Sequence, residues 1–155
     1  DLTMMLYQIT EEFYPAFSSK GLQLNANIQP GLRLRGDADK LARVFDNLLR
    51  NAVSYSYENT VIQLIAQSEG DYIQIIVRNR GDRIPPQKLE RLFEKFYRVD
   101  TSRGTASGGA GLGLAIAKQL VELHQGTIEV RSLDTYTEFM VQLPGKSRAE
   151  QEQSS

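Results

Sequence analysis

The sequence contains no cysteine and a single histidine, His124. Disulfide bonds, thiol nucleophiles and cysteine-ligated zinc are therefore excluded, and so is a histidine-rich metal centre. There is also no excess of charge of either sign, because 18 basic residues stand against 19 acidic ones, for a formal net charge of -1. This balance lacks the electrostatic footprint of a protein that binds nucleic acid or an anionic membrane, so no nucleic-acid partner is expected.

Long apolar runs are missing as well. None approaches the roughly 18 residues that indicate a membrane span, and the N-terminal DLTMMLYQITEEF has no signal-peptide anatomy. The 155 residues are enough for one domain with a single core. Because the chain starts without Met and in the middle of a helical pattern, we expect one soluble domain taken from a longer protein.

Hydrophobic periodicity predicts the elements. Helical spacing runs from about Leu2 to Ser19, and again from an N-cap at Asp37 to about Tyr55. A short helix is predicted at 87–93, and LGLAIAKQLVELH is a helix that Gln125-Gly126 terminates. Alternating patterns predict strands at LQLNANI, TVIQLIAQ, YIQIIVR, TIEVRS and EFMVQLP.

These elements predict an α/β (α+β) domain, a mixed sheet with helices packed on one face, over residues 1–144. Residues 145–155 are polar, and we expect them to form a disordered tail. The segment FYRVDTSRGTASGGA has no period and is rich in Gly, Ser and Thr, so a long mobile loop is predicted there.

The second long helix carries a polar stripe about 120° from its apolar face. Asparagine is a poor helix former, yet Asn47 and Asn51 lie one turn apart on this stripe. Their amide oxygens are hard ligands suited to Mg²⁺, and a merely solvated helix face remains the alternative. The stripe consists of Lys40, Arg43, Asn47, Asn51 and Ser54.

The stretch SGGAGLGLAIAK, residues 107–118, sets four glycines before a helix. Backbone N–H groups at such a helix start can cradle a phosphate, although a flexible loop is the other reading. A dinucleotide fingerprint would follow directly on a strand, and a P-loop would contain Gly-Lys-Ser or Gly-Lys-Thr; neither condition is met.

Four motif-like segments follow one another along the chain: NLLRNAVSYS, NRGDRIP, FEKFYR and GGAGLGLAIA. In this order and at these separations they resemble the N, G1, F and G2 boxes of sensor histidine kinases, within the gyrase, Hsp90, histidine kinase and MutL superfamily. The resemblance covers nearly the whole chain. Among sensor kinases, FEKFYRVD followed by GGAGLGLAIAK is most similar to the vancomycin-resistance sensors.

The resemblance implies a Bergerat-type two-layer sandwich that binds ATP and Mg²⁺ between the N-box helix and a glycine-rich ATP lid, roughly residues 98–110. It implies that Asn51 is the metal ligand, and that Asn47 and Arg98 act in catalysis, with Arg98 reaching the γ-phosphate. The implied nucleotide-contacting residues are Asn47, Asn51, Tyr55, Asn79, Gly81, Ile84, Phe96, Arg98, Gly109, Gly111, Leu112 and Gly113.

Three positions depart from the family pattern. Asn79 stands where an aspartate usually accepts from the adenine amino group, and loss of that charge costs on the order of 1 kcal/mol. Arg83 replaces the second glycine of the G1 box, and Ser54 stands where many relatives have a basic residue. Together these departures predict weak nucleotide binding.

The resemblance also defines what this chain lacks. No acceptor histidine with the family's flanking residues is present, and His124 ends an apolar helix, where a capping or half-buried structural role is expected. We therefore expect a sensor kinase catalytic domain that phosphorylates a histidine on the dimerisation hairpin of its parent, and through it a response regulator. The implied parent is a membrane-anchored bacterial homodimer with this domain on the cytoplasmic side.

Two other functions remain open. An interaction module that has lost useful nucleotide binding is consistent with Asn79, Arg83 and Ser54. A hydrolysing ATPase of the superfamily would place a glutamate near position 47 to activate water, and Asn47 counts against it.

Overall fold

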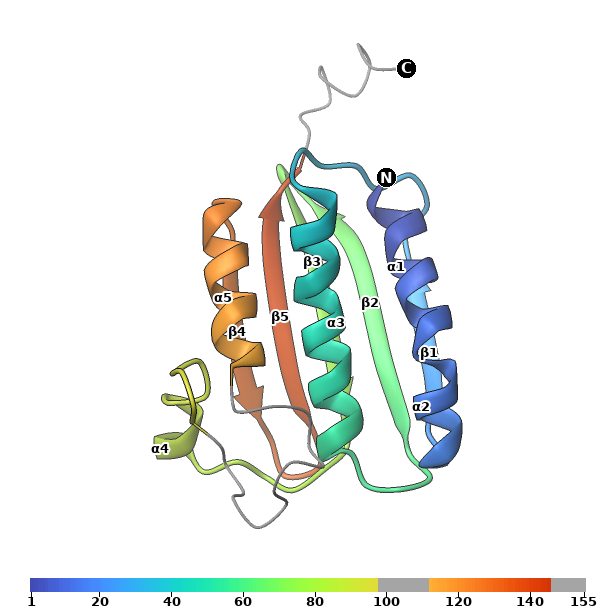
Figure 1. The fold of residues 1–155 in the computed structure, drawn as a ribbon, viewed down its shortest axis with the longest axis vertical. Coiled ribbons are helices and arrows are strands. Elements are labelled where there is room, and N and C mark those ends of the chain that lie inside the picture. Colours follow the sequence, from blue (N-terminus) through green and yellow to red (C-terminus); the bar gives the residue numbers. More distant parts are fainter. Residues whose placement is uncertain (98–111, 146–155) are drawn as a thin grey trace.

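The computed structural model describes residues 1–97 and 112–145. Within these ranges five strands form one sheet in the order β1-β2-β3-β5-β4 (Figure 1). β1 pairs with β2 in parallel and the other three pairs are antiparallel, so the sheet is mixed as predicted. The strands are β1 (Gln23–Ile28), β2 (Val61–Glu69), β3 (Tyr72–Asn79), β4 (Thr127–Ser132) and β5 (Thr137–Pro144).

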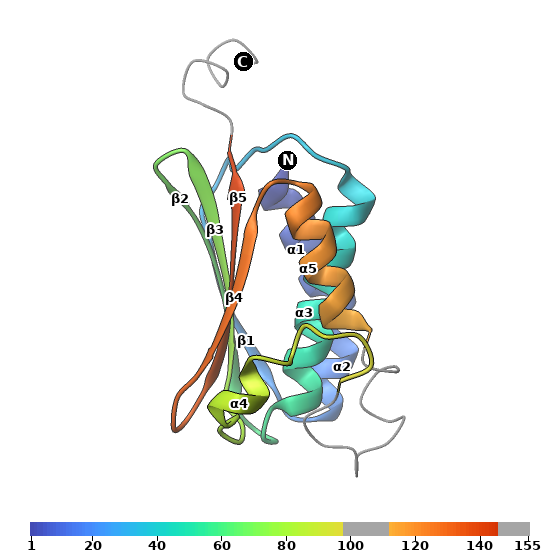
Figure 2. The same ribbon diagram turned by 90° about the vertical axis from the view of Figure 1, so that its left-hand side faces the viewer.

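The helices form the second layer. Figure 2 shows the long helices on one side of the sheet, with α3 and α5 next to each other, while no described element covers the opposite face. In the described ranges no helix is both long and apolar enough to cross a membrane. The helices are α1 (Leu2–Glu12), α2 (Tyr14–Ser19), α3 (Ala38–Tyr55), α4 (Pro86–Leu89) and α5 (Gly113–Leu123).

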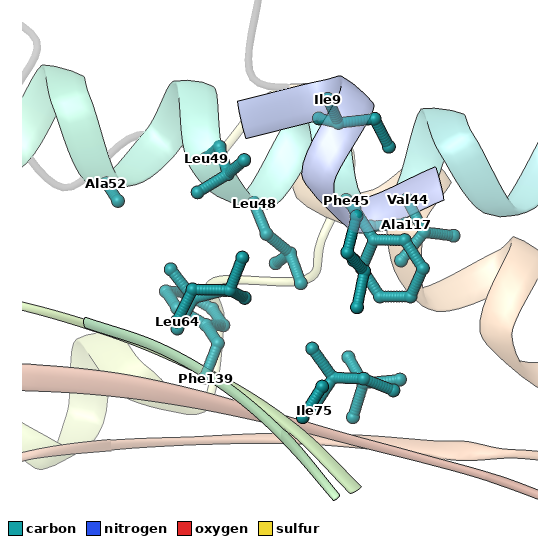
Figure 3. Packing of buried hydrophobic residues seen from close by; sticks show 14 of the residues in the cluster. Ile9, Val44, Phe45, Leu48, Leu49, Ala52, Leu64, Ile75, Ala117 and Phe139 are labelled. Carbon is teal, nitrogen blue, oxygen red and sulfur yellow. The ribbon is translucent and has the colours of Figure 1, made fainter. Parts of the chain in front are cut away.

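The core lies between α3 and the middle of the sheet. The apolar stripe of α3 packs toward Leu64, Ile75 and Phe139 (Figure 3). Every member of the stripe is 2% exposed or less, and burying each large side chain stabilises the fold by about 1.5–3 kcal/mol. The stripe consists of Leu41, Val44, Phe45, Leu48, Leu49 and Ala52.

The uncovered face of the sheet carries a charged row in which Glu138 lies between two arginines. Nη2 of Arg78 donates to Oε1 of Glu138 at 2.9 Å, and Nε of Arg131 donates to Oε2 at 2.5 Å. Burial alone would raise the pKa of Glu138, but the hydrogen bonds from Arg131 and Arg78 outweigh it and lower the pKa. The row therefore ties β3, β5 and β4 together while Glu138 is ionised.

The predicted helix at Leu2 to Ser19 is two helices, because the chain breaks at Phe13. Pro15 lies in the first turn of α2, where its missing N–H costs nothing, whereas in mid-helix it would remove a backbone bond. α4 ends at Leu89, earlier than the predicted 93. At the other end of the chain, Gly145 is not free of the fold, because its N–H donates to the carbonyl of Asp71 at 2.8 Å.

His124 has a structural role, as predicted. It follows the last turn of α5, where its Nδ1 donates to the carbonyl of Leu120 at 2.8 Å. Its Nε2 accepts from the backbone N–H of Asp37 at 3.0 Å, directly before α3. One imidazole thus joins the end of α5 to the start of α3.

The end of α3 and the start of α5 lie at the other end of the domain. The end of α3, the end of β3, the β4–β5 turn, α4 and the start of α5 all lie toward the lower end of Figure 1. The predicted site residues within the described ranges lie on these elements or on the segments that join them.

Candidate functional site

Asn47 links α3 to the start of α5. Its Nδ2 donates to the carbonyl of Gly113 at 3.0 Å. A β-carbon at Gly113 would lie 3.7 Å from Cγ of Asn47, so the two helices approach closely here. With its nitrogen engaged in this bond, Asn47 has its Oδ1 left to contact a ligand.

Asn51 lies one turn further along α3, half-buried at the edge of the same helix face. Among the described residues no group of three or more His, Cys, Asp or Glu side chains could hold a metal ion. A cation here would take its ligands from amide oxygens, water and an incoming phosphate, and these hard oxygen donors suit Mg²⁺.

Asn79 and Gly81 form a buried corner against the end of α3. Asn79 is 2% exposed, and its Nδ2 finds no hydrogen-bond partner in residues 1–97 and 112–145. A β-carbon at Gly81 would lie 2.3 Å from the carbonyl oxygen of Tyr55 and 3.3 Å from Nδ2 of Asn79. Only glycine permits this approach, and a buried amide nitrogen without a partner is an exception among folded proteins that calls for an explanation.

Two hydroxyl groups beside this corner were missed by sequence reasoning. Thr137 pairs across the sheet with Asn79, and its Oγ1 lies 3.1 Å from Oγ of Ser132. Oγ of Ser132 accepts from the backbone N–H of Ile84 at 2.8 Å, which fixes the segment after β3. No sequence signal marked these hydroxyls, because only the pairing of β3 with β5 brings them to Asn79.

The segments that follow α3 and β3 are joined to each other by hydrogen bonds. The N–H of Tyr57 donates to the carbonyl of Arg80 at 2.8 Å, and the hydroxyl of Tyr57 donates to Asp82. This hydrogen bond to Asp82 raises the pKa of Tyr57. From the α2 side, Nζ of Lys20 donates to the carbonyls of Val53 at 2.7 Å and Ser54 at 3.1 Å, where it also complements the helix dipole.

Arg83 turns away from the corner. Its guanidinium lies 3.5 Å from Asp134 in the β4–β5 turn, and both side chains are largely exposed. The guanidinium of the arginine that replaces a G1 glycine is therefore directed toward the β4–β5 turn and not over Gly81 and Asn79.

The remaining predicted residues are less tightly placed. Ile84 is half-buried against the core, whereas Phe96 is 68% exposed with a left-handed backbone, φ 66°. Leu112 directly precedes α5, whose first turn has no side-chain cap. Arg98, Gly109 and Gly111, with the whole of the predicted lid, lie outside the described residues.

The described part of the site therefore extends from Asn79 to the start of α5, here called the wall, and it is polar at both ends. At one end, Asn47 and Asn51 lie beside the uncapped start of α5, whose N–H groups favour anions. At the other end, Asn79 offers an unpaired amide beside Gly81 and Thr137. Such an arrangement suits a ligand with a phosphate end and a polar heterocyclic end.

Known proteins are similar to this chain in sequence and in fold. Sensor protein VanS of Enterococcus faecium is 49% identical over 144 residues, which cover 93% of this chain and 37% of VanS. The mycobacterial sensor histidine kinase MprB superposes with a TM-score of 0.81 at 27% identity, over 95% of this chain and 96% of that structure. Full-length ShkA, solved in complex with AMPPNP, superposes with a TM-score of 0.80 at 28% identity, over 95% of this chain and 30% of ShkA.

The identity to VanS confirms the resemblance to the vancomycin-resistance sensors. The chain spans little more than a third of the length of VanS, so the resemblance covers one part of such a protein. Residues 36–147 match the family model described as histidine kinase-, DNA gyrase B- and HSP90-like ATPase. The match includes α3, the Asn79 corner and α5. The chain therefore belongs to the histidine kinase-, DNA gyrase B- and HSP90-like ATPase family, and it is similar to the corresponding part of sensor histidine kinases.

Proposed function

We propose that this domain binds ATP with Mg²⁺ along the wall between Asn79 and the start of α5. Its parent protein then uses the bound nucleotide to phosphorylate a histidine on a helical hairpin outside this chain. The observation that carries the proposal is the buried amide nitrogen of Asn79, which has no partner among the described residues. Leaving it unpaired costs about 1–3 kcal/mol, and the polar edge of a purine satisfies it.

The phosphate end of the nucleotide belongs at α5. The uncapped N–H groups of its first turn favour phosphate oxygens, and the bond from Asn47 to Gly113 holds this turn against α3. Asn51 supplies an amide oxygen one turn away on the same edge of α3. Mg²⁺ bound there would neutralise charge on the phosphates, which is most of what phosphoryl transfer requires.

The residues present favour transfer to an imidazole over hydrolysis. Asn47 carries an amide and cannot take a proton from water, whereas a histidine acceptor is already a nucleophile. Asp46, its neighbour, forms an ion pair with Arg50 at 2.9 Å on another side of α3. The resemblance to sensor kinases supports three further parts of this proposal: an acceptor hairpin, a response regulator and placement on the cytoplasmic side of a membrane.

Calorimetric titration of the 155-residue chain with AMPPNP, with and without Mg²⁺, tests the proposal. Wild type should bind in a Mg²⁺-dependent manner, and Asn51→Ala should lose that dependence with an unchanged melting temperature, because Asn51 lies off the buried stripe. Asn25→Ala, an exposed amide on β1, is the matched control and should bind as wild type does.

Each other outcome has a distinct meaning. Unchanged Mg²⁺ dependence in Asn51→Ala would refute the metal assignment alone. Absence of binding by wild type would refute the proposal and favour an interaction module. Steady release of phosphate from ATP by the isolated chain would favour a hydrolysing ATPase.

A further inference from the structure

Asn79 gives the base-binding end of the wall one donor and one acceptor on a single side chain. It ends β3 at 2% exposure, with its Nδ2 unpaired among the described residues. Gly81 lies beside it: a β-carbon there would lie 3.3 Å from Nδ2 and 2.3 Å from the carbonyl oxygen of Tyr55. The amide nitrogen therefore lies next to the one position in this corner that has no side chain.

A carboxamide can present either of its polar atoms to a ligand. Rotation by 180° about its last bond exchanges the oxygen acceptor and the nitrogen donor. Because no described residue accepts from Nδ2, this rotation breaks no hydrogen bond at nitrogen. A carboxylate at the same place would present acceptors only.

Purines with different groups at carbon 6 need opposite partners. Adenine has an amino donor next to a ring-nitrogen acceptor, whereas guanine and hypoxanthine have an oxo acceptor next to a ring N–H donor. In one orientation Asn79 matches the adenine pair, and after rotation it matches the 6-oxo pair. We propose that Asn79 lets this site accept 6-amino and 6-oxo purine nucleotides alike.

The neighbouring hydroxyls are equally adaptable. Thr137 pairs with Asn79 across the sheet, and either Thr137 or Ser132 can donate in the 3.1 Å bond between them. The N–H of Ile84 donates to Ser132 in both cases. Reversing the hydroxyl bond changes what Thr137 presents, so Thr137, like Asn79, is not fixed as a donor or an acceptor.

The inference rests on the proposed nucleotide site, and the test uses ADP and IDP, which share every atom outside the six-position edge of the base. Calorimetry should give wild-type dissociation constants for ADP and IDP within about tenfold of each other. Asn79→Asp should raise the IDP-to-ADP ratio at least about tenfold, because the carboxylate leaves the 6-oxo group facing an acceptor. Asn25→Asp makes the same chemical change on the exposed side of β1 and should leave the ratio at its wild-type value.

A wild-type preference for ADP above about tenfold, or an unchanged ratio in folded Asn79→Asp, would overturn the inference. If Asn79→Asp does not fold, the wild-type ratio alone decides. If wild type binds neither diphosphate, the proposed nucleotide site fails and this inference falls with it. Tight binding of ADP with rejection of IDP refutes only the role given to Asn79.

Discussion

Gly81 and Gly113 lie at opposite ends of the site, and the same substitution should affect stability differently at each. In Gly81→Ala the new methyl group would lie 2.3 Å from the carbonyl oxygen of Tyr55. In Gly113→Ala the nearest neighbour is Cγ of Asn47 at 3.7 Å, an ordinary contact distance. The end of α3 or the segment after β3 must therefore move for the first variant and not for the second.

The magnitudes follow from these distances. The contact at residue 81 is about 1 Å too short, and relieving such overpacking costs about 1–3 kcal/mol. Gly113 begins α5, where alanine has a helix propensity up to about 1 kcal/mol better than glycine. For a domain of this size, 1 kcal/mol corresponds to roughly 2–4 °C in melting temperature.

Urea unfolding followed by circular dichroism measures both variants against wild type. Gly81→Ala should lose about 1–3 kcal/mol, and Gly113→Ala should be as stable as wild type or slightly more so. AMPPNP titration should show weakened binding for both, because the first shifts the base end and the second adds a methyl group where phosphates approach. Equal stability of the two variants would refute the close-approach reasoning at Gly81.

Two further predictions concern stability alone. The folded pKa of Glu138 is lowered, so the stabilisation that its carboxylate contributes is complete above the ordinary value of 4.5 and is lost as pH falls through the folded pKa. Glu138→Gln should therefore flatten the decline in unfolding free energy below about pH 4.5. Urea titrations in which the variant and wild type decline in parallel would contradict this. Gln125 follows α5 with φ 61°, a conformation that favours glycine, so Gln125→Gly should stabilise by about 0.5–1 kcal/mol, and a lower melting temperature would contradict this.

Periodic burial made most of the fold predictable. The stripe from Leu41 to Ala52 repeats at helical spacing because one side of α3 faces the sheet, and the capping role of Asp37 is confirmed by its bond to the N–H of Lys40. Alternation located all five strands, since one face of the sheet packs against helices and the other does not. The break at Phe13 was missed, although Pro15 is the residue that determines it.

Candidate site residues could be proposed from the sequence only where a residue type or a motif is itself informative. The polar stripe on its helix and the resemblance in motif order both pointed to Asn47, whereas Asn79 and Gly81 came from the resemblance alone. The structure brings Asn79 and Gly81 together against the end of α3. The hydroxyls of Ser132 and Thr137 carry no such signal, because their meaning comes from strand pairing.

Contacts distant in sequence were not predictable either. Lys20 reaches the end of α3 across more than 30 positions, and no local pattern reports such a contact. The direction of Arg83 depends on Asp134 in a turn formed by two later strands.

The most direct test of the central claim reads the side-chain amides of the site by nuclear magnetic resonance. Titration with AMPPNP and Mg²⁺ should shift the resonances of Asn47, Asn51 and Asn79 together, at one common dissociation constant. Asn25 and Asn27, on the exposed side of β1, should not move. Shifts at β1 with none at Asn47, Asn51 and Asn79 would contradict the account, because the nucleotide would then bind elsewhere.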